Sequence, residues 1–218
     1  MQFIIDTADF AEIKRINRIF PVDGVTTNPK IIAKETKDLL TVIKGIREII
    51  GKEKSLHIQI LSETSKQMVE EAERIVMKAG ESTFIKVPVT EEGIQAIPIL
   101  KSKGIRITAT AVYTPLQALV AAKSGADYVA PYITRTDNIG GDGVALATDI
   151  DAMLKNYRLP CRVLGASFAT VAQITALALS GVEAVTLPPE LFYKMIRHPM
   201  TEEAVAEFIR LGKPYYNI

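Results

Sequence analysis

Short β-type runs alternate with longer amphipathic stretches from one end of this 218-residue chain to the other. Each run is rich in apolar and β-branched residues and is closed by a polar residue, Pro or Gly, which is typical of a strand followed by a loop. The pattern predicts strands at Phe3–Asp6, Gly24–Thr27, Leu56–Ile60, Thr83–Val87, Arg106–Thr110, Tyr128–Tyr132, Arg162–Ser167 and Ala184–Leu187. Because alternating strands and helices form parallel sheets with helical crossovers, eight such units favour a closed (β/α)8 TIM barrel.

The amphipathic segments carry helix start and stop signals. In Ser65–Ala79 apolar residues recur at three- and four-residue steps, and Pro115–Ser124 has Pro at its expected first turn. Thr64 and Thr90 are suited to cap helix N-termini. Glycines lie where helices are expected to end, at Gly80, Gly104, Gly125 and Gly181.

One domain is expected over residues 1–218, a barrel with a C-terminal helical tail, because no linker or low-complexity segment marks a boundary. The alternative, an open sheet with a nucleotide at its switch point, lacks its fingerprints: there is no G-x-G-x-x-G after the first strand and no Walker motif. The Gly-rich phrase Asn138–Gly143 is interpreted as a flexible loop whose backbone amides could approach an anion.

Composition narrows the class of protein. A hydrophobic share of 48% and a charged share of 23% are typical of a globular chain with a sizeable core. The 26 basic and 25 acidic residues are spread along the chain, so neither nucleic acid nor a membrane is an expected partner. No apolar stretch reaches transmembrane length and no signal peptide is visible. Cys161 is the only cysteine, which suits a reducing compartment, so a cytoplasmic location is expected.

Polar residues stand at the C-terminal ends of the first seven predicted strands or just after them. In a TIM barrel the loops that follow the strands form the active-site face, so these residues are the candidate active-site residues. They are Asp6, Thr26, Asn28, Gln59, Lys86, Thr110, Tyr132, Arg135 and Ser167.

Lys86 is the most informative of them, because the run Phe84–Pro88 is otherwise apolar. Desolvation disfavours the ammonium form and lowers the pKa of a buried lysine, which yields a free amine able to attack a carbonyl. A lysine paired with a carboxylate across the barrel is the alternative. The strand alone does not separate these two interpretations.

The other polar groups suit Schiff-base chemistry. The phenol of Tyr132 can relay a proton, and Gln59 and Thr110 can hold a water without adding charge. Asp6 can accept hydrogen bonds from substrate hydroxyls or orient the lysine amine. Each residue alone could be a hydrogen-bonded core group, and for Thr26 and Thr110 that is the better interpretation. As a set on one face they indicate a site.

Arg135 and Ser167 indicate a phosphorylated substrate. A guanidinium can bind a phosphate with two parallel hydrogen bonds, although a single arginine is more often a surface residue. Ser167 is expected to end a strand before a helix that begins near Ala169–Thr170, so its hydroxyl and the helix N-terminus could contact the same anion.

Metal and hydrolase chemistry are not expected. His57 and His198 are the only histidines, neither has a metal-ligand spacing, and Cys161 has no cysteine partner. No G-x-S-x-G elbow is present. His57 shares a strand face with Gln59 and is interpreted as a packed or hydrogen-bonded histidine.

Four phrases in this order resemble the small transaldolases and fructose-6-phosphate aldolases over nearly the whole chain. They are Phe3–Ala8, Gly24–Pro29, Ile85–Pro88 and Ala130–Tyr132 with Arg135. The resemblance implies a (β/α)8 barrel, a Schiff-base lysine at Lys86, no metal or organic cofactor, and a homo-oligomer, commonly a decamer of two pentameric rings. It also implies that Asp6 and Asn28 orient donor hydroxyls with support from Thr26.

The family contains two activities. Transaldolases pass a dihydroxyacetone unit between sugar phosphates, whereas the aldolases release it. Transaldolases typically have Glu at the position of Gln59, Phe at Tyr132 and Asn at Thr108, so this chain is more similar to the aldolases of fructose 6-phosphate. It departs from both branches at Ala169, where a basic residue is usual. A non-catalytic barrel that binds sugar phosphates is a further alternative, because a fold does not establish activity.

Overall fold

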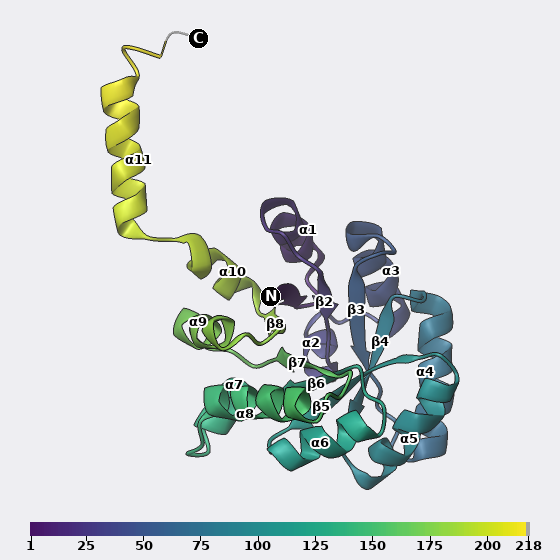
Figure 1. The fold of residues 1–218 in the computed structure, drawn as a ribbon. Coiled ribbons are helices and arrows are strands. Elements are labelled where there is room, and N and C mark those ends of the chain that lie inside the picture. The colour runs from purple at the N-terminus through teal and green to yellow at the C-terminus, as the bar shows by residue number, and fades with distance from the viewer. Residues whose placement is uncertain (217–218) are drawn as a thin grey trace.

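The computed structural model describes residues 1–216, and its centre is a closed barrel of eight parallel strands in the order β1 to β8 (Figure 1). The strands are β1 (Gln2–Asp6), β2 (Gly24–Thr26), β3 (Ser55–Gln59), β4 (Thr83–Pro88), β5 (Arg106–Val112), β6 (Tyr128–Pro131), β7 (Arg162–Gly165) and β8 (Ala184–Leu187). The predicted TIM barrel is therefore confirmed, with all eight strands present and their ends displaced by at most two residues.

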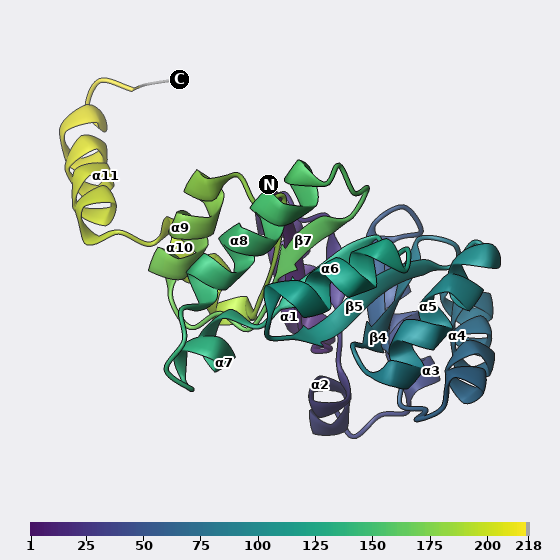
Figure 2. The same ribbon diagram turned by 60° about the horizontal axis from the view of Figure 1, so that its bottom comes forward.

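Helices connect successive strands around the barrel, and two more helices follow the last strand (Figures 1 and 2). They are α1 (Phe10–Ile19), α2 (Pro29–Lys34), α3 (Leu39–Ile50), α4 (Ser65–Ala79), α5 (Glu91–Ser102), α6 (Pro115–Lys123), α7 (Ile133–Asp137), α8 (Gly143–Asn156), α9 (Val171–Ser180), α10 (Pro189–Ile196) and α11 (Pro199–Gly212). Thr64 and Thr90 cap α4 and α5 with side-chain hydrogen bonds, as predicted. Gly80 and Gly181 end α4 and α9.

The barrel ends differ from the predicted strands at β6 and β7. Tyr132 is the N-cap residue of α7 rather than the last residue of β6, and it forms an isolated parallel bridge with Ala166. Ser167 lies two residues past β7, with a φ of 62°. A left-handed backbone is strained for a residue other than glycine, and it turns the chain out of the sheet here.

The apolar core has two parts. The larger part lies between the strands and the surrounding helices, and residues such as Ile5, Val25 and Ile85 are fully buried in it. The smaller part fills the barrel interior at the N-terminal ends of the strands and consists of Ile4, Phe84, Tyr128, Ala130, Leu164 and Ala184. Because this plug closes one end of the barrel, the polar interior residues lie toward the other end.

The Gly-rich phrase Asn138–Gly143 joins α7 to α8. Its amides are largely committed to the protein: the N–H of Gly141 donates to the Thr136 carbonyl at 3.0 Å, and that of Gly143 donates to Asp137 Oδ1 at 2.7 Å. These contacts argue against the loop as an anion site.

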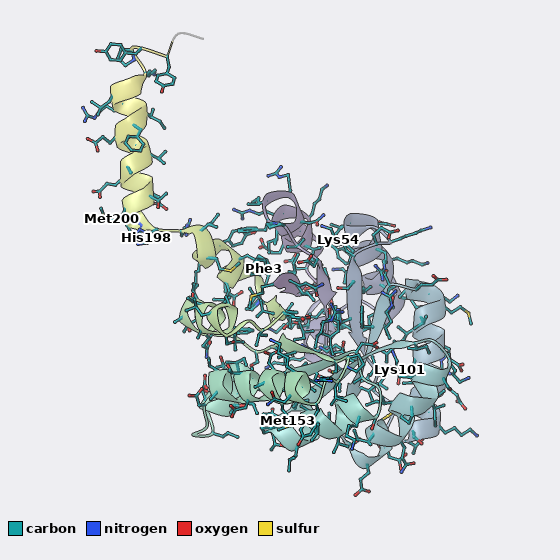
Figure 3. All side chains as sticks on the ribbon, viewed as in Figure 1. Phe3, Lys54, Lys101, Met153, His198 and Met200 are labelled. Carbon is teal, nitrogen blue, oxygen red and sulfur yellow. The ribbon has the colours of Figure 1, made fainter. Side chains whose placement is uncertain are left out.

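The C-terminal helix α11 stands clear of the barrel in both views (Figures 1 and 2). The chain leaves the barrel after α10, near His198 and Met200 (Figure 3). No residue of α11 is buried within the described chain. The predicted C-terminal helical tail is therefore present, and none of its residues is buried in a hydrophobic core.

Candidate active site

Lys86 lies inside the barrel on β4, with 6% of its surface exposed. Its Nζ donates a hydrogen bond to the backbone carbonyl of Thr27 at 2.8 Å. Burial lowers the pKa of Lys86, the positive charge of Arg135 lowers it further, and the carboxylate of Asp6 raises it. Because burial is the largest of these effects, the amine loses its proton at a lower pH than an exposed lysine does.

Gln59 and Thr108 are the residues beside Lys86 on the two neighbouring strands. Gln59 on β3 pairs with Lys86, and Lys86 pairs with Thr108 on β5. Side chains at paired positions of adjacent parallel strands point to the same face of the sheet. The three side chains therefore line one stretch of the barrel interior.

Asp6 and Thr26 are joined at the ends of β1 and β2. The Thr26 hydroxyl donates to Asp6 Oδ1 at 2.7 Å, and Thr26 Oγ1 also lies 2.5 Å from Thr186 Oγ1 of β8. This contact leaves the second carboxylate oxygen of Asp6 for another partner. Asn28 caps α2 by accepting the Ile31 N–H at 3.0 Å, so its side-chain oxygen is occupied and its amide N–H groups are the ones left to meet a ligand.

Tyr132 is fixed from several sides. Its hydroxyl lies 3.1 Å from Thr110 Oγ1. Its ring packs edge-on against Tyr113, with centroids 5.5 Å apart, and the Arg135 guanidinium lies 4.5 Å from the ring centroid. The phenol and the Thr110 hydroxyl therefore form a hydrogen-bonded pair near the C-terminal ends of β5 and β6.

Backbone hydrogen bonds join α7, which carries Arg135, to the loop after β7, which contains Ser167. The Ile133 N–H donates to the Ala166 carbonyl at 2.8 Å, and the Thr134 N–H donates to the Ser167 carbonyl at 2.7 Å. The sequence placed both residues at this face, and the structure adds the short helix that carries Arg135.

The helix N-terminus after Ser167 is less available to an anion than the sequence suggested. The N–H groups of Ala169 and Thr170 both donate to Gln173 Oε1, at 2.9 and 3.0 Å, because Thr170 and Gln173 form a capping box. Gln173 Nε2 in turn donates to Asp137 Oδ2 at 2.7 Å. These amides would have to leave Gln173 before they could bind a phosphate.

His57 is packed deep in the barrel, as the sequence interpretation expected. Its ring stacks on Phe84 with a centroid distance of 4.5 Å, and its Nδ1 lies 2.9 Å from Thr108 Oγ1. Burial lowers the pKa of His57 to about 3, so the imidazole is neutral at physiological pH.

Three features of this region were missed by sequence reasoning. Thr27 contributes through its backbone carbonyl, which leaves no signal in a sequence. Thr186 is a polar residue in the apolar run of β8, a signal that was present, and its contact with Thr26 follows from barrel closure. Thr108 was noted only as a departure from one branch, and its contact with His57 requires the fold.

Across residues 1–216, no cluster of three or more His, Cys, Asp or Glu side chains could hold a metal ion. Burial raises the pKa of the Cys161 thiol to about 12, so a thiolate does not form there at neutral pH. Within the same part of the chain no helix combines the length and apolarity that a membrane span requires.

Comparison with known proteins agrees with the geometry. A solved structure of a mandelate oxidase variant with an FMN adduct matches with a TM-score of 0.59 and 11% identity, over 87% of this chain. The match spans 64% of the oxidase chain, and at this identity it reports the barrel fold alone. The family profile described as transaldolase/fructose-6-phosphate aldolase matches residues 3–213. The chain belongs to the transaldolase/fructose-6-phosphate aldolase family.

Proposed function

We propose that this protein is a Schiff-base (class I) aldolase that cleaves fructose 6-phosphate into dihydroxyacetone and glyceraldehyde 3-phosphate, and forms it in the reverse direction. The observation that carries the proposal is Lys86, a buried lysine with a lowered pKa in a family of aldolases and transaldolases. Such a lysine supplies an uncharged amine for attack on a ketone.

The reaction would begin when the Lys86 amine attacks carbon 2 of the ketose and water leaves, giving an iminium. Loss of the carbon 4 hydroxyl proton breaks the bond between carbons 3 and 4. The electron pair of that bond moves into the iminium, glyceraldehyde 3-phosphate departs, and an enamine remains. Protonation of carbon 3 and addition of water then release dihydroxyacetone and restore the amine. The iminium is the electron sink, so no cofactor is required by this route.

Three further residues have roles at the donor end of the substrate in this proposal, and two at its phosphate end. Asp6 and Asn28 orient the donor hydroxyls, Asp6 through its free carboxylate oxygen and Asn28 through its amide N–H groups. Thr26 holds Asp6 in place by a hydrogen bond of 2.7 Å. Arg135 and Ser167 would bind the phosphate of the aldehyde at the opposite end.

The aldolase branch is favoured over the transaldolase branch by the Tyr132–Thr110 pair. Release of dihydroxyacetone needs a proton for the enamine and a water for the iminium. The Tyr132 phenol, 3.1 Å from the Thr110 hydroxyl, can supply the proton. Thr110 and Gln59, which lies beside the lysine, can hold the water without adding charge. A transferase instead benefits from keeping water away until the acceptor arrives.

The test compares the two activities on one preparation. Cleavage of fructose 6-phosphate is followed through dihydroxyacetone release, and transfer is followed with erythrose 4-phosphate as acceptor. The proposal expects release to exceed transfer. Transfer without free dihydroxyacetone would identify a transaldolase, and binding of sugar phosphates with neither reaction would identify a non-catalytic barrel.

We also propose that the protein is a homo-oligomer assembled through α11, in the form of a decamer, and that it is cytoplasmic. Large apolar side chains of α11 are exposed, among them Phe208 at 69% and Ile209 at 62%. With Tyr216 they border a hollow of about 830 Å³. A 14-residue helix with no buried residue is marginal in water, so a second copy of the chain is the partner we assign to it.

A further inference from the structure

Asp137 joins three helices at the phosphate end of the site, and the proposed reaction gives it no role. It is the last residue of α7, the short helix that carries Arg135. Its Oδ1 accepts the N–H of Gly143, the first residue of α8, at 2.7 Å, and its Oδ2 accepts a hydrogen bond from Gln173 Nε2 of α9 at 2.7 Å. One carboxylate therefore links the C-terminal end of α7 to the first turns of α8 and α9.

Backbone groups fix the direction of each hydrogen bond in this link. Gln173 Oε1 accepts the N–H groups of Ala169 and Thr170, so the other end of the amide, Nε2, must face Asp137. On its other side Asp137 faces the Gly143 N–H, which is also a donor. Both oxygens at position 137 must therefore accept. A carboxylate does so, whereas the side-chain amide of an asparagine offers one acceptor and one donor.

The two ends of α7 are held in different ways. At the N-terminal end, the backbone N–H groups of residues 132–134 donate to carbonyls at the end of β5 and in the loop after β7. The C-terminal end lies beyond these bonds, and the side-chain contacts of Asp137 tie it to α8 and α9. Tyr132 belongs to the first end, whereas Arg135 lies two residues before Asp137. Loss of the Asp137 contacts should therefore displace Arg135 more than Tyr132.

We propose that Asp137 is a positioning residue for phosphate recognition: its carboxylate holds the C-terminal end of α7 against α8 and α9, and so sets Arg135 relative to Ser167. This inference rests on the proposed function and names the residue that organises its phosphate end. Asp137 acts through Arg135 and does not contact substrate. By its charge alone, a carboxylate so close to Arg135 would disfavour a phosphate. The positioning role and the charge therefore predict opposite results when the charge is removed.

The first test measures the addition of dihydroxyacetone to phosphorylated and unphosphorylated glyceraldehyde. Asp137→Asn removes the charge and sets two donors against each other. The KM for glyceraldehyde 3-phosphate should rise by about tenfold, the effect of losing one charge-assisted hydrogen bond. The KM for glyceraldehyde and kcat with either aldehyde should stay the same, because Tyr132 is held at the other end of α7. Asp149→Asn, which removes a charge from an exposed position of α8, is the matched control.

The second test exchanges the polarity of the two side chains. In Asp137→Asn combined with Gln173→Glu, the new carboxylate can accept the N–H groups of Ala169 and Thr170 and also the new amide N–H at position 137. The oxygen of that amide still accepts the Gly143 N–H, so all the donors are satisfied again. Gln173→Glu alone sets two carboxylates against each other and should raise the KM for glyceraldehyde 3-phosphate. The double variant should bring this KM back toward the native value, which independent effects of the two substitutions would not do.

An unchanged or lower KM for glyceraldehyde 3-phosphate in folded Asp137→Asn would overturn the proposal, as would a double variant no better than either single variant. If Asp137→Asn does not fold, Gln173→Glu is compared with the double variant, and failure of the double variant to recover overturns the proposal. Borohydride trapping of dihydroxyacetone separates the two levels. A native protein that is not trapped refutes the proposed function together with this inference, whereas trapping with an unchanged KM refutes the role of Asp137 alone.

Discussion

At the scale of single residues, the chemistry depends on a lysine that is placed where its charge is unfavourable. Lys86 has one hydrogen-bond acceptor, the Thr27 carbonyl, and two charged groups that act on it in opposite directions. Asp6 favours the ammonium form and Arg135 disfavours it. Substitution of either charged residue should therefore change the pKa of Lys86.

We predict that the two charges move the pH profile of imine formation in opposite directions. Burial lowers the pKa of Lys86, so imine formation should persist below the pH at which an exposed lysine becomes protonated. Asp6→Asn removes a charge that raises this pKa, so the rising limb should move to lower pH. Arg135→Leu removes a charge that lowers the pKa, so the limb should move to higher pH. The measurement is the initial rate of trapping against pH, and shifts of the same sign would contradict the account.

Tyr132→Phe tests the assignment of the proton relay. We predict that the variant loses dihydroxyacetone release by roughly 100-fold or more, the usual contribution of a general acid or base. Transfer to erythrose 4-phosphate should make up a larger share of the remaining turnover. Tyr113→Phe, which keeps the edge-on ring beside Tyr132, is the matched control. Full aldolase activity in Tyr132→Phe would show that another group carries the proton.

Most candidate residues could be predicted from the sequence, because polar residues at the ends of apolar runs must face the barrel mouth. Lys86, Asp6 and Tyr132 are of this kind. The contacts among them could not be predicted. The pairing of His57 with Thr108 joins β3 to β5 across the interior, and the link from Thr26 to Thr186 joins β2 to β8, so both depend on barrel closure.

At the scale of elements, the phosphate end of the site depends on how α9 begins. Its capping box directs Gln173 to the amides of Ala169 and Thr170 and also to Asp137. The capping signal T-x-x-Q was readable in the sequence. The exact ends of β5 and β7 could not be predicted from the sequence, because Ala111 and Ser167 adopt a positive φ although neither is a glycine.

Ala169→Lys should improve recognition of a phosphorylated aldehyde. The side chain would start from an exposed position two residues after Ser167, and one charge-assisted hydrogen bond would lower the KM for glyceraldehyde 3-phosphate by about tenfold or more. The KM for unphosphorylated glyceraldehyde should stay the same. Ala178→Lys, exposed at the other end of α9, is the control. A native preference for the phosphorylated aldehyde that the added lysine leaves unchanged would show that Arg135 and Ser167 suffice.

At the scale of the whole molecule, the alternation of strands and helices in the sequence predicts the barrel. It does not predict where the C-terminal helix lies. The pattern of α11 predicts a helix, but no sequence signal says that the helix leaves the barrel. Its direction is visible only in the structure (Figure 1). Its exposed apolar residues would be an unstable surface in a single chain.

We predict that Phe208→Glu together with Ile209→Glu dissociates the native oligomer. Burial of a large apolar side chain contributes about 1.5–3 kcal/mol, and a charge at the same place adds a desolvation cost. Light scattering should report a lower mass for the double variant, while Glu203→Gln on the same helix should keep the native mass. A native protein that is monomeric, or a double variant of unchanged mass, would contradict assembly through α11.

The central claim is tested most directly by borohydride reduction in the presence of dihydroxyacetone, followed by mass spectrometry of the digested protein. We predict one added reduced three-carbon unit, located on Lys86, and no addition in Lys86→Met or without the ketone. Lys101, which is paired with Asp127 at 2.7 Å on the outside of the barrel, should remain unmodified. A label on another lysine, or no label in a preparation that turns over fructose 6-phosphate, would contradict the assignment of Lys86 as the nucleophile.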